Sequence, residues 1–137
     1  MDREMAAFWE AVHERWSAPD HRREEDVALS VLVHFARRLP GPEAQHLKER
    51  LPAPIQEWPE LEPERRRVEQ PPAERTSYTD FVFAIAQENG MADPADADAA
   101  TRGVFRALGR VLPDDERRHI AAQLPRDFQM VWNDETS

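Results

Sequence analysis

Apolar residues recur at helical spacing along most of the chain. The first set occupies one face of a helix over roughly residues 4–16, because its members lie three or four positions apart. Its members are Met5, Phe8, Trp9, Val12 and Trp16. The segment 17–20 interrupts this pattern, and a second stripe then runs over residues 28–39. A similar succession begins again at residue 81, so the pattern predicts helices in both parts of the chain.

Prolines mark the expected ends of these helices. Proline lacks a backbone N–H and clashes with the preceding turn, so it ends a helix, yet it is tolerated at the first helical position. Pro40 and Pro113 each follow a long apolar stripe, and Pro52 and Pro125 each come twelve residues later. We expect each of them to close one helix and open a shorter one.

These prolines belong to a sequence motif that occurs twice. Residues 39–52 and 112–125 both read LP-x-x-E-x-x-H-[LI]-x-x-x-LP, at an offset of seventy-three residues that holds without a gap from Phe8 to Gln129. No segment shows the alternation of a strand. The sequence therefore predicts an all-α, internally duplicated helical bundle with two pseudo-equivalent halves of three to four helices each. Leu51 and Leu124 should be buried at equivalent places.

Composition divides the chain into three parts. Residues 1–58 form the first predicted repeat, and residues 76–137 form the second. Between them, residues 59–75 contain four prolines among glutamates and arginines, which predicts a linker that is extended for part of its length. We expect the two repeats to pack together as one compact domain.

The second half also carries the motifs of a known family. They are an F-x-x-x-[VI]-A helix at residues 81–86, a long helix from Ala97 that ends in Leu-Pro at 112–113, and an E-x-x-x-[LI]-x-x-Q-L-P segment at 116–125. With these motifs the half resembles the DUF2267 family of bacterial proteins of unknown function. The first half departs from the family pattern, since Arg50 precedes Leu-Pro where glutamine is usual. The resemblance implies an all-α duplicated fold and implies no activity.

Charge and composition exclude several classes of protein. The formal net charge is −9, which is the wrong sign for a general binder of nucleic-acid phosphates. The chain contains no cysteine, which excludes disulfides, thiol nucleophiles and cysteine-based zinc sites and is typical of a cytoplasmic protein. No run approaches the roughly 18 apolar residues of a membrane helix. We therefore expect neither a membrane nor a nucleic acid as partner.

The duplicated Glu-x-x-His is the sharpest chemical candidate. Glu43 and His46, like Glu116 and His119, lie one helical turn apart, and a repeated Glu-x-x-His is typical of di-metal carboxylate bundles. Those sites lie midway along long helices, whereas these residues lie in the first turns of short ones, without a second repeat-matched pair of carboxylates. We favour the interpretation that the glutamates complement helix N-termini and the histidines are half-exposed. Metal binding is the alternative, and no cofactor is predicted.

Charged residues around the start of the second helix receive a similar interpretation. Glu24 lies in the first turn, where the helix dipole favours a negative charge. His13 and His21 have neither a repeat-matched histidine nor the spacing of metal ligands. We expect both of these side chains to be solvated.

The remaining candidates favour binding over catalysis. Trp58, at the end of the first half, either packs between the halves or contacts a partner, as exposed tryptophans often do. The basic run Arg65, Arg66 and Arg67 is flanked by glutamates that nearly cancel its charge. We predict a non-enzymatic helical protein–protein interaction module, whose unidentified protein partner contacts Trp58 and this run.

Overall fold

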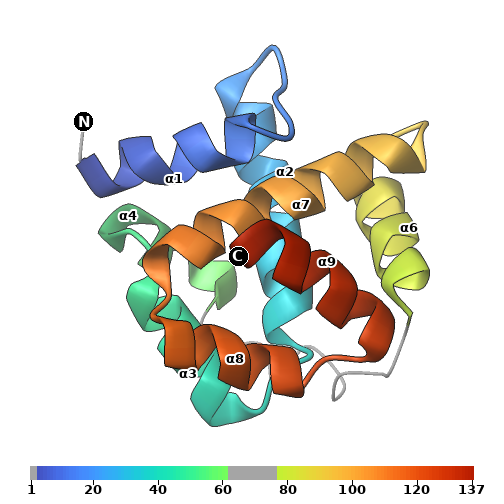
Figure 1. Ribbon diagram of the computed structural model, residues 1–137. Helices are drawn as coiled ribbons and strands as arrows, with labels where there is room; N and C mark the ends of the chain where they lie inside the picture. Colours follow the sequence, from blue (N-terminus) through green and yellow to red (C-terminus); the bar gives the residue numbers. More distant parts are fainter. Residues whose placement is uncertain (1–2, 62–76) are drawn as a thin grey trace.

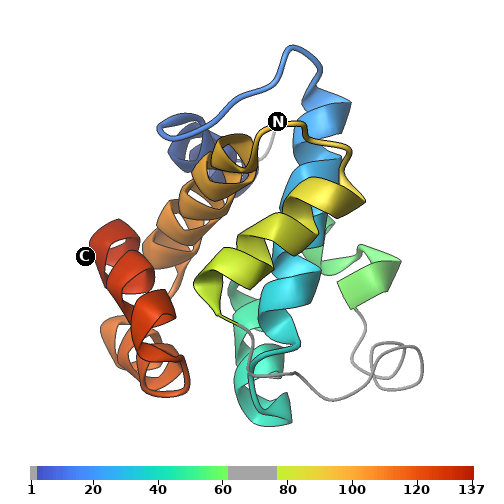
Figure 2. The ribbon, with the colours of Figure 1, turned by 90° about the vertical axis from the view of Figure 1, so that its right-hand side faces the viewer.

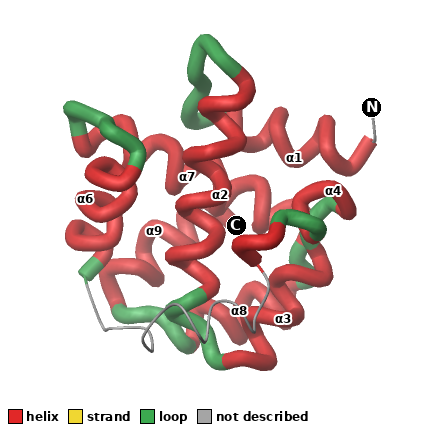
Figure 3. Tube along the Cα trace, turned by 180° about the vertical axis from the view of Figure 1, so that it is seen from behind, coloured by secondary structure: helices red, strands yellow, loops and turns green. Residues whose placement is uncertain are grey.

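The computed structural model describes residues 3–61 and 77–137, and over these ranges the chain forms helices and turns without a strand (Figures 1 and 3). The predicted all-α class is confirmed. The elements are α1 (Arg3–His13), α2 (His21–Ala36), α3 (Gly41–Arg50), α4 (Ala53–Gln56), the 3₁₀ turn η1 (Pro59–Leu61), α6 (Tyr78–Glu88), α7 (Pro94–Val111), α8 (Asp114–Ala122) and α9 (Arg126–Thr136). None of these helices is both long and apolar enough to span a bilayer.

The longest of these helices, α7, crosses the middle of the molecule (Figure 1). It packs against α1, α2, α6 and α9. Two glycines allow its neighbours to come close. A Cβ atom at Gly103 would lie 2.7 Å from the backbone oxygen of Val12 in α1, and one at Gly109 would lie 2.8 Å from the Cα atom of Thr136 in α9. These two glycines therefore allow α1 and α9 to lie close to α7.

Helices from the two halves of the sequence share one core. Although α1 lies in the first half, it packs against α7 of the second, and α6 packs against both α2 and α7. The rings of Phe105 and Trp132 lie 4.9 Å and 5.2 Å from the ring of Phe35 in α2, measured between centroids. Figure 2 shows α2 beside α6, with α7 next to them and α9 on the other side of α7. The buried residues of both halves therefore form one continuous cluster.

The helices begin where the sequence predicts. The N-cap residues recur at the offset of seventy-three, with similar backbone angles within each pair. The pairs are Asp20 and Asp93, Pro40 and Pro113, and Pro52 and Pro125. Leu51 and Leu124 are both buried, as expected. The order of helix starts thus repeats, while close superposition of the two halves stays a prediction.

The two predicted repeats differ most in their last helix. Helix α4 has four residues, whereas α9, which begins at the equivalent place, has eleven. The first three residues of the predicted linker form η1, whose Leu61 is buried where η1 packs against α2. The rest of that linker up to residue 75 lies outside the described residues. The additional turns of α9 carry Glu135, whose ion pairs are described below.

Candidate functional site

The duplicated Glu-x-x-His motif lies on α3 and α8. His46 and His119 are exposed, and Glu116 accepts hydrogen bonds from Arg50, with Nε 3.3 Å from Oε2 and Nη2 3.0 Å from Oε1. This ion pair joins α3 to α8, the two short helices at the bottom of Figure 1. Among residues 3–61 and 77–137, no group of three histidine, aspartate or glutamate side chains is arranged to hold a metal ion. Metal binding through Glu43, His46, Glu116 and His119 therefore stays a prediction.

The predicted partner-binding residues are only partly described. Trp58 lies between α4 and η1, is half-buried and packs against the edge of the core. Its backbone N–H donates to the carbonyl of Ile55, at 3.0 Å. Arg65, Arg66 and Arg67 lie outside the described residues. Part of the Trp58 indole remains available to a partner.

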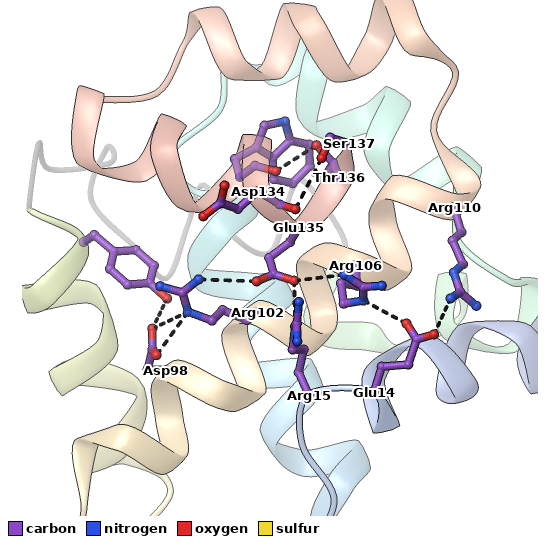
Figure 4. A network of polar contacts seen from close by, with 12 residues as sticks. Glu14, Arg15, Asp98, Arg102, Arg106, Arg110, Asp134, Glu135, Thr136 and Ser137 are labelled. Carbon is purple, nitrogen blue, oxygen red and sulfur yellow. Dashed lines mark hydrogen bonds and ion pairs between the residues drawn. The ribbon is translucent and has the colours of Figure 1, made fainter.

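The most enclosed charge in the second half is Glu135, in the last turn of α9. Its side chain is 3% exposed and accepts hydrogen bonds from three arginines (Figure 4). Arg15 Nε lies 3.0 Å and Arg106 Nη1 3.4 Å from Oε1, and Arg102 Nη1 lies 3.3 Å from Oε2. A buried carboxylate needs such partners, because leaving it unpaired is costly. Glu135 therefore ties the end of α9 to α7 and to the segment after α1.

A second carboxylate extends this network on the α1 side. Glu14 accepts from Arg106 Nε at 2.8 Å and from Arg110 Nη2 at 2.6 Å (Figure 4). The hydrogen bond from Arg106, with that from Arg110, holds the pKa of the Glu14 carboxyl below its usual value. Arg102, Arg106 and Arg110 are spaced one helical turn apart on α7, so a single face of that helix presents all three guanidinium groups.

A third cluster closes the connection between α1 and α2. The Glu24 side chain is 5% exposed and accepts the backbone N–H of Ala18, at 2.9 Å. His13 Nε2 and His21 Nδ1 each lie 2.9 Å from one of its oxygens. Burial alone would raise the pKa of Glu24, but the hydrogen bonds from His21, Ala18 and His13 outweigh it and hold that pKa below its usual value. The histidines are 43% and 53% exposed, so the expectation of solvation missed their shared partner.

These clusters meet at the end of α1. His13 contacts Glu24 of α2, Glu14 contacts two arginines of α7, and Arg15 contacts Glu135 of α9. Three consecutive residues are thus bound to three different helices. We refer to His13, Glu14 and Arg15 as the α1 anchor. It fixes α1 relative to the second half of the chain.

The comparison with protein families finds one family whose model spans most of the chain. The family model described as "Uncharacterized conserved protein (DUF2267)" matches residues 5–131. The chain belongs to the DUF2267 family. This confirms the resemblance inferred from the second half and extends it over the first. A search of curated proteins found no match.

Sequence reasoning on this DUF2267 protein did not single out the charged residues around Glu135 and Glu14. The spacing of the three arginines on α7 is visible in the sequence, and it indicates a charged helix face. Glu135, the partner of Arg102 and Arg106, lies 29 to 33 residues away from them along the chain, and Arg15 lies 120 residues from that same carboxylate. Only the packing of α1 and α9 on α7 brings these groups together.

Proposed function

We propose that this DUF2267 protein is a non-enzymatic helical module that binds another protein through its surface. One observation carries the proposal: the two most enclosed carboxylates of the described residues, Glu24 and Glu135, are each bound by groups of the same chain. These ion pairs stabilise a fixed arrangement of helices. Both carboxylates are occupied by their partners, so neither of them is an unpaired acid or base. Recognition then falls to side chains at the surface. The absence of cysteine supports a cytoplasmic location.

We place the partner contact around Trp58 and the basic run Arg65, Arg66 and Arg67. Trp58 combines a core-packed edge with a solvent-facing part, and tryptophan is enriched among residues that dominate binding energies. The net charge of −9 supports a protein partner over a nucleic acid.

The test is cross-linking of the tagged protein in its native host, followed by identification of the captured proteins. Trp58→Ala should reduce capture of a reproducible partner at least tenfold while the circular dichroism spectrum and melting temperature stay close to those of the wild type. Phe83→Ala is the matched control. It also removes an exposed aromatic ring, 54% exposed, but from α6. Equal loss of capture in both variants, or in neither, contradicts the proposed site.

A double substitution distinguishes the protein-binding proposal from the metal-binding alternative. His46→Ala with His119→Ala should leave capture intact, because both imidazoles are placed outside the contact. Metal analysis of untagged protein accompanies this variant. Two results together would favour metal binding over the interaction proposal. The wild type would contain near-stoichiometric iron, manganese or zinc that is lost in the double variant, and the folded double variant would have lost function.

A further inference from the structure

The connection between α1 and α2 is closed by a single buried carboxylate. His13 ends α1 and His21 begins α2, and the carboxylate of Glu24 receives both of their side chains. The same carboxylate accepts the backbone N–H of Ala18, which lies in the connection itself. Glu24 therefore binds one group before the turn, one within it and one after it.

The three side chains differ in their access to protons. Glu24 is buried, whereas the imidazoles of His13 and His21 are about half-exposed and can exchange protons with the solvent. Histidine is the side chain type that ordinarily changes charge between pH 5 and 8. Glu24 stays ionised over that range, because its hydrogen bonds hold its pKa below the usual value. Proton uptake by an imidazole therefore adds an ionic attraction to its contact with the ionised carboxylate, which strengthens that contact.

We propose that Glu24, His13 and His21 form a proton-operated latch that tightens the connection between α1 and α2 as the pH falls from 8 to 5.5. A tighter latch holds the α1 anchor more firmly, because His13 is one of its three residues. The device acts within the chain and needs no partner.

The helix ends favour His13 as the main responder. His13 lies in the last turn of α1, where the helix dipole favours a positive charge. His21 is the first residue of α2, where the dipole opposes one. We therefore assign the pH response of the latch chiefly to His13, while His21 chiefly positions the carboxylate.

The other charged groups that face the latch are held elsewhere. On the α1 side, Glu14 is bound to Arg106 and Arg110 of α7, and Arg15 to Glu135 of α9. On the α2 side, the side chain of Asp20 caps the helix, and Arg23 donates to the carbonyl of Asn89 after α6. The remaining sequence neighbours with charge are Glu10, Arg22, Glu25 and Asp26, all at least partly exposed. The response between pH 8 and 5.5 is thus assigned to the two imidazoles.

The amide of Ala18 provides the readout, because it hydrogen-bonds directly to Glu24. Its hydrogen-exchange protection, measured by NMR and corrected for the intrinsic pH dependence of exchange, should rise about threefold or more between pH 8 and 5.5. The core amide of Trp132 serves as a reference for the fold. The variant with His13→Gln and His21→Gln keeps side-chain donors that do not titrate, and its Ala18 protection should not change with pH.

Two outcomes overturn the proposal: a flat profile at Ala18 in the wild type, or an undiminished rise in the double variant. If the double variant does not fold, as judged by the Trp132 amide, the single change His13→Gln decides. It removes the response if the latch works as described. An unchanged rise in folded His13→Gln also overturns the proposal.

Discussion

Gly103 provides a sharp test of how α1 packs on α7. Replacing a glycine by alanine inside a helix normally stabilises it by about 1 kcal/mol. At Gly103 the new Cβ atom would lie 2.7 Å from the backbone oxygen of Val12 and 3.2 Å from its Cα atom. Because the obstacle is the backbone of another helix, no side-chain rotation relieves the clash. We therefore expect Gly103→Ala to destabilise the protein.

The size of the effect follows from the distance that α1 must move. Ordinary contact begins near 3.4 Å, so α1 has to withdraw by about 0.7 Å. A gap of that size forfeits about a quarter to a half of each dispersion contact. The buried face of α1, which includes Phe8, Trp9 and Val12, bears this loss. Overpacking typically costs about 1–3 kcal/mol, and the gain in helix propensity offsets about 1, so the net loss is about 1 kcal/mol.

Urea unfolding measures this difference, and Gly109→Ala is the matching test of the contact between α7 and α9. Both glycines lie on α7, and the Cβ atom at position 109 would lie 2.8 Å from the backbone Cα atom of Thr136, in the last turn of α9. We expect a lower midpoint with an unchanged slope for both variants. A Gly103→Ala protein as stable as the wild type, or more stable, would refute the close approach of α1 to α7.

Three further predictions concern buried groups. Glu135→Gln leaves three arginines without their shared anion and should cost about 1–3 kcal/mol in urea unfolding, since those arginines are partly exposed, whereas Asp134→Asn at an exposed position should change little. The pKa of Glu24 is lowered in the folded state, so its contribution to stability is complete above pH 4.5 and is lost as the pH falls through the lower folded-state pKa. Unfolding curves at pH 3 to 5 should accordingly show a shallower acid limb for Glu24→Gln, and an identical limb would contradict the assignment. Leu51→Ala and Leu124→Ala should each cost about 2–5 kcal/mol by thermal unfolding, and losses below about 1 kcal/mol at both would contradict their burial in the core.

The helices and their starts are predictable because local chemistry sets them. Asp93 and Ser77 accept backbone N–H groups of the helices that they precede, and Gly90 takes the left-handed conformation, with φ of 64°, that ends the turn after α6. These roles depend on the residue and its immediate neighbours in the chain. The apolar stripe that includes Trp132 likewise marks a buried helix face, and that residue is fully buried.

The charged sites depend on packing that the sequence does not display. Glu24 reads as an ordinary acidic residue of a first helical turn, and His13 and His21 read as solvated. The turn between α1 and α2 reverses the chain so that both imidazoles reach one oxygen each of that carboxylate. Glu135 reads as part of a polar tail, yet the close packing of α9 on α7 buries it. The partners of a buried charge cannot be predicted from the sequence where tertiary packing alone brings them together.

The packing of α1 against α7 also affects how the chain folds during synthesis. The last residue of α7, Val111, is made 98 residues after His13, the last residue of α1. At about 5–20 residues per second, the ribosome needs roughly 5–20 seconds to cover that interval. Throughout it, the apolar face of α1, with Phe8 and Trp9, has no completed α7 to cover it. The nascent chain therefore exposes a ready binding site for chaperones until its second half emerges.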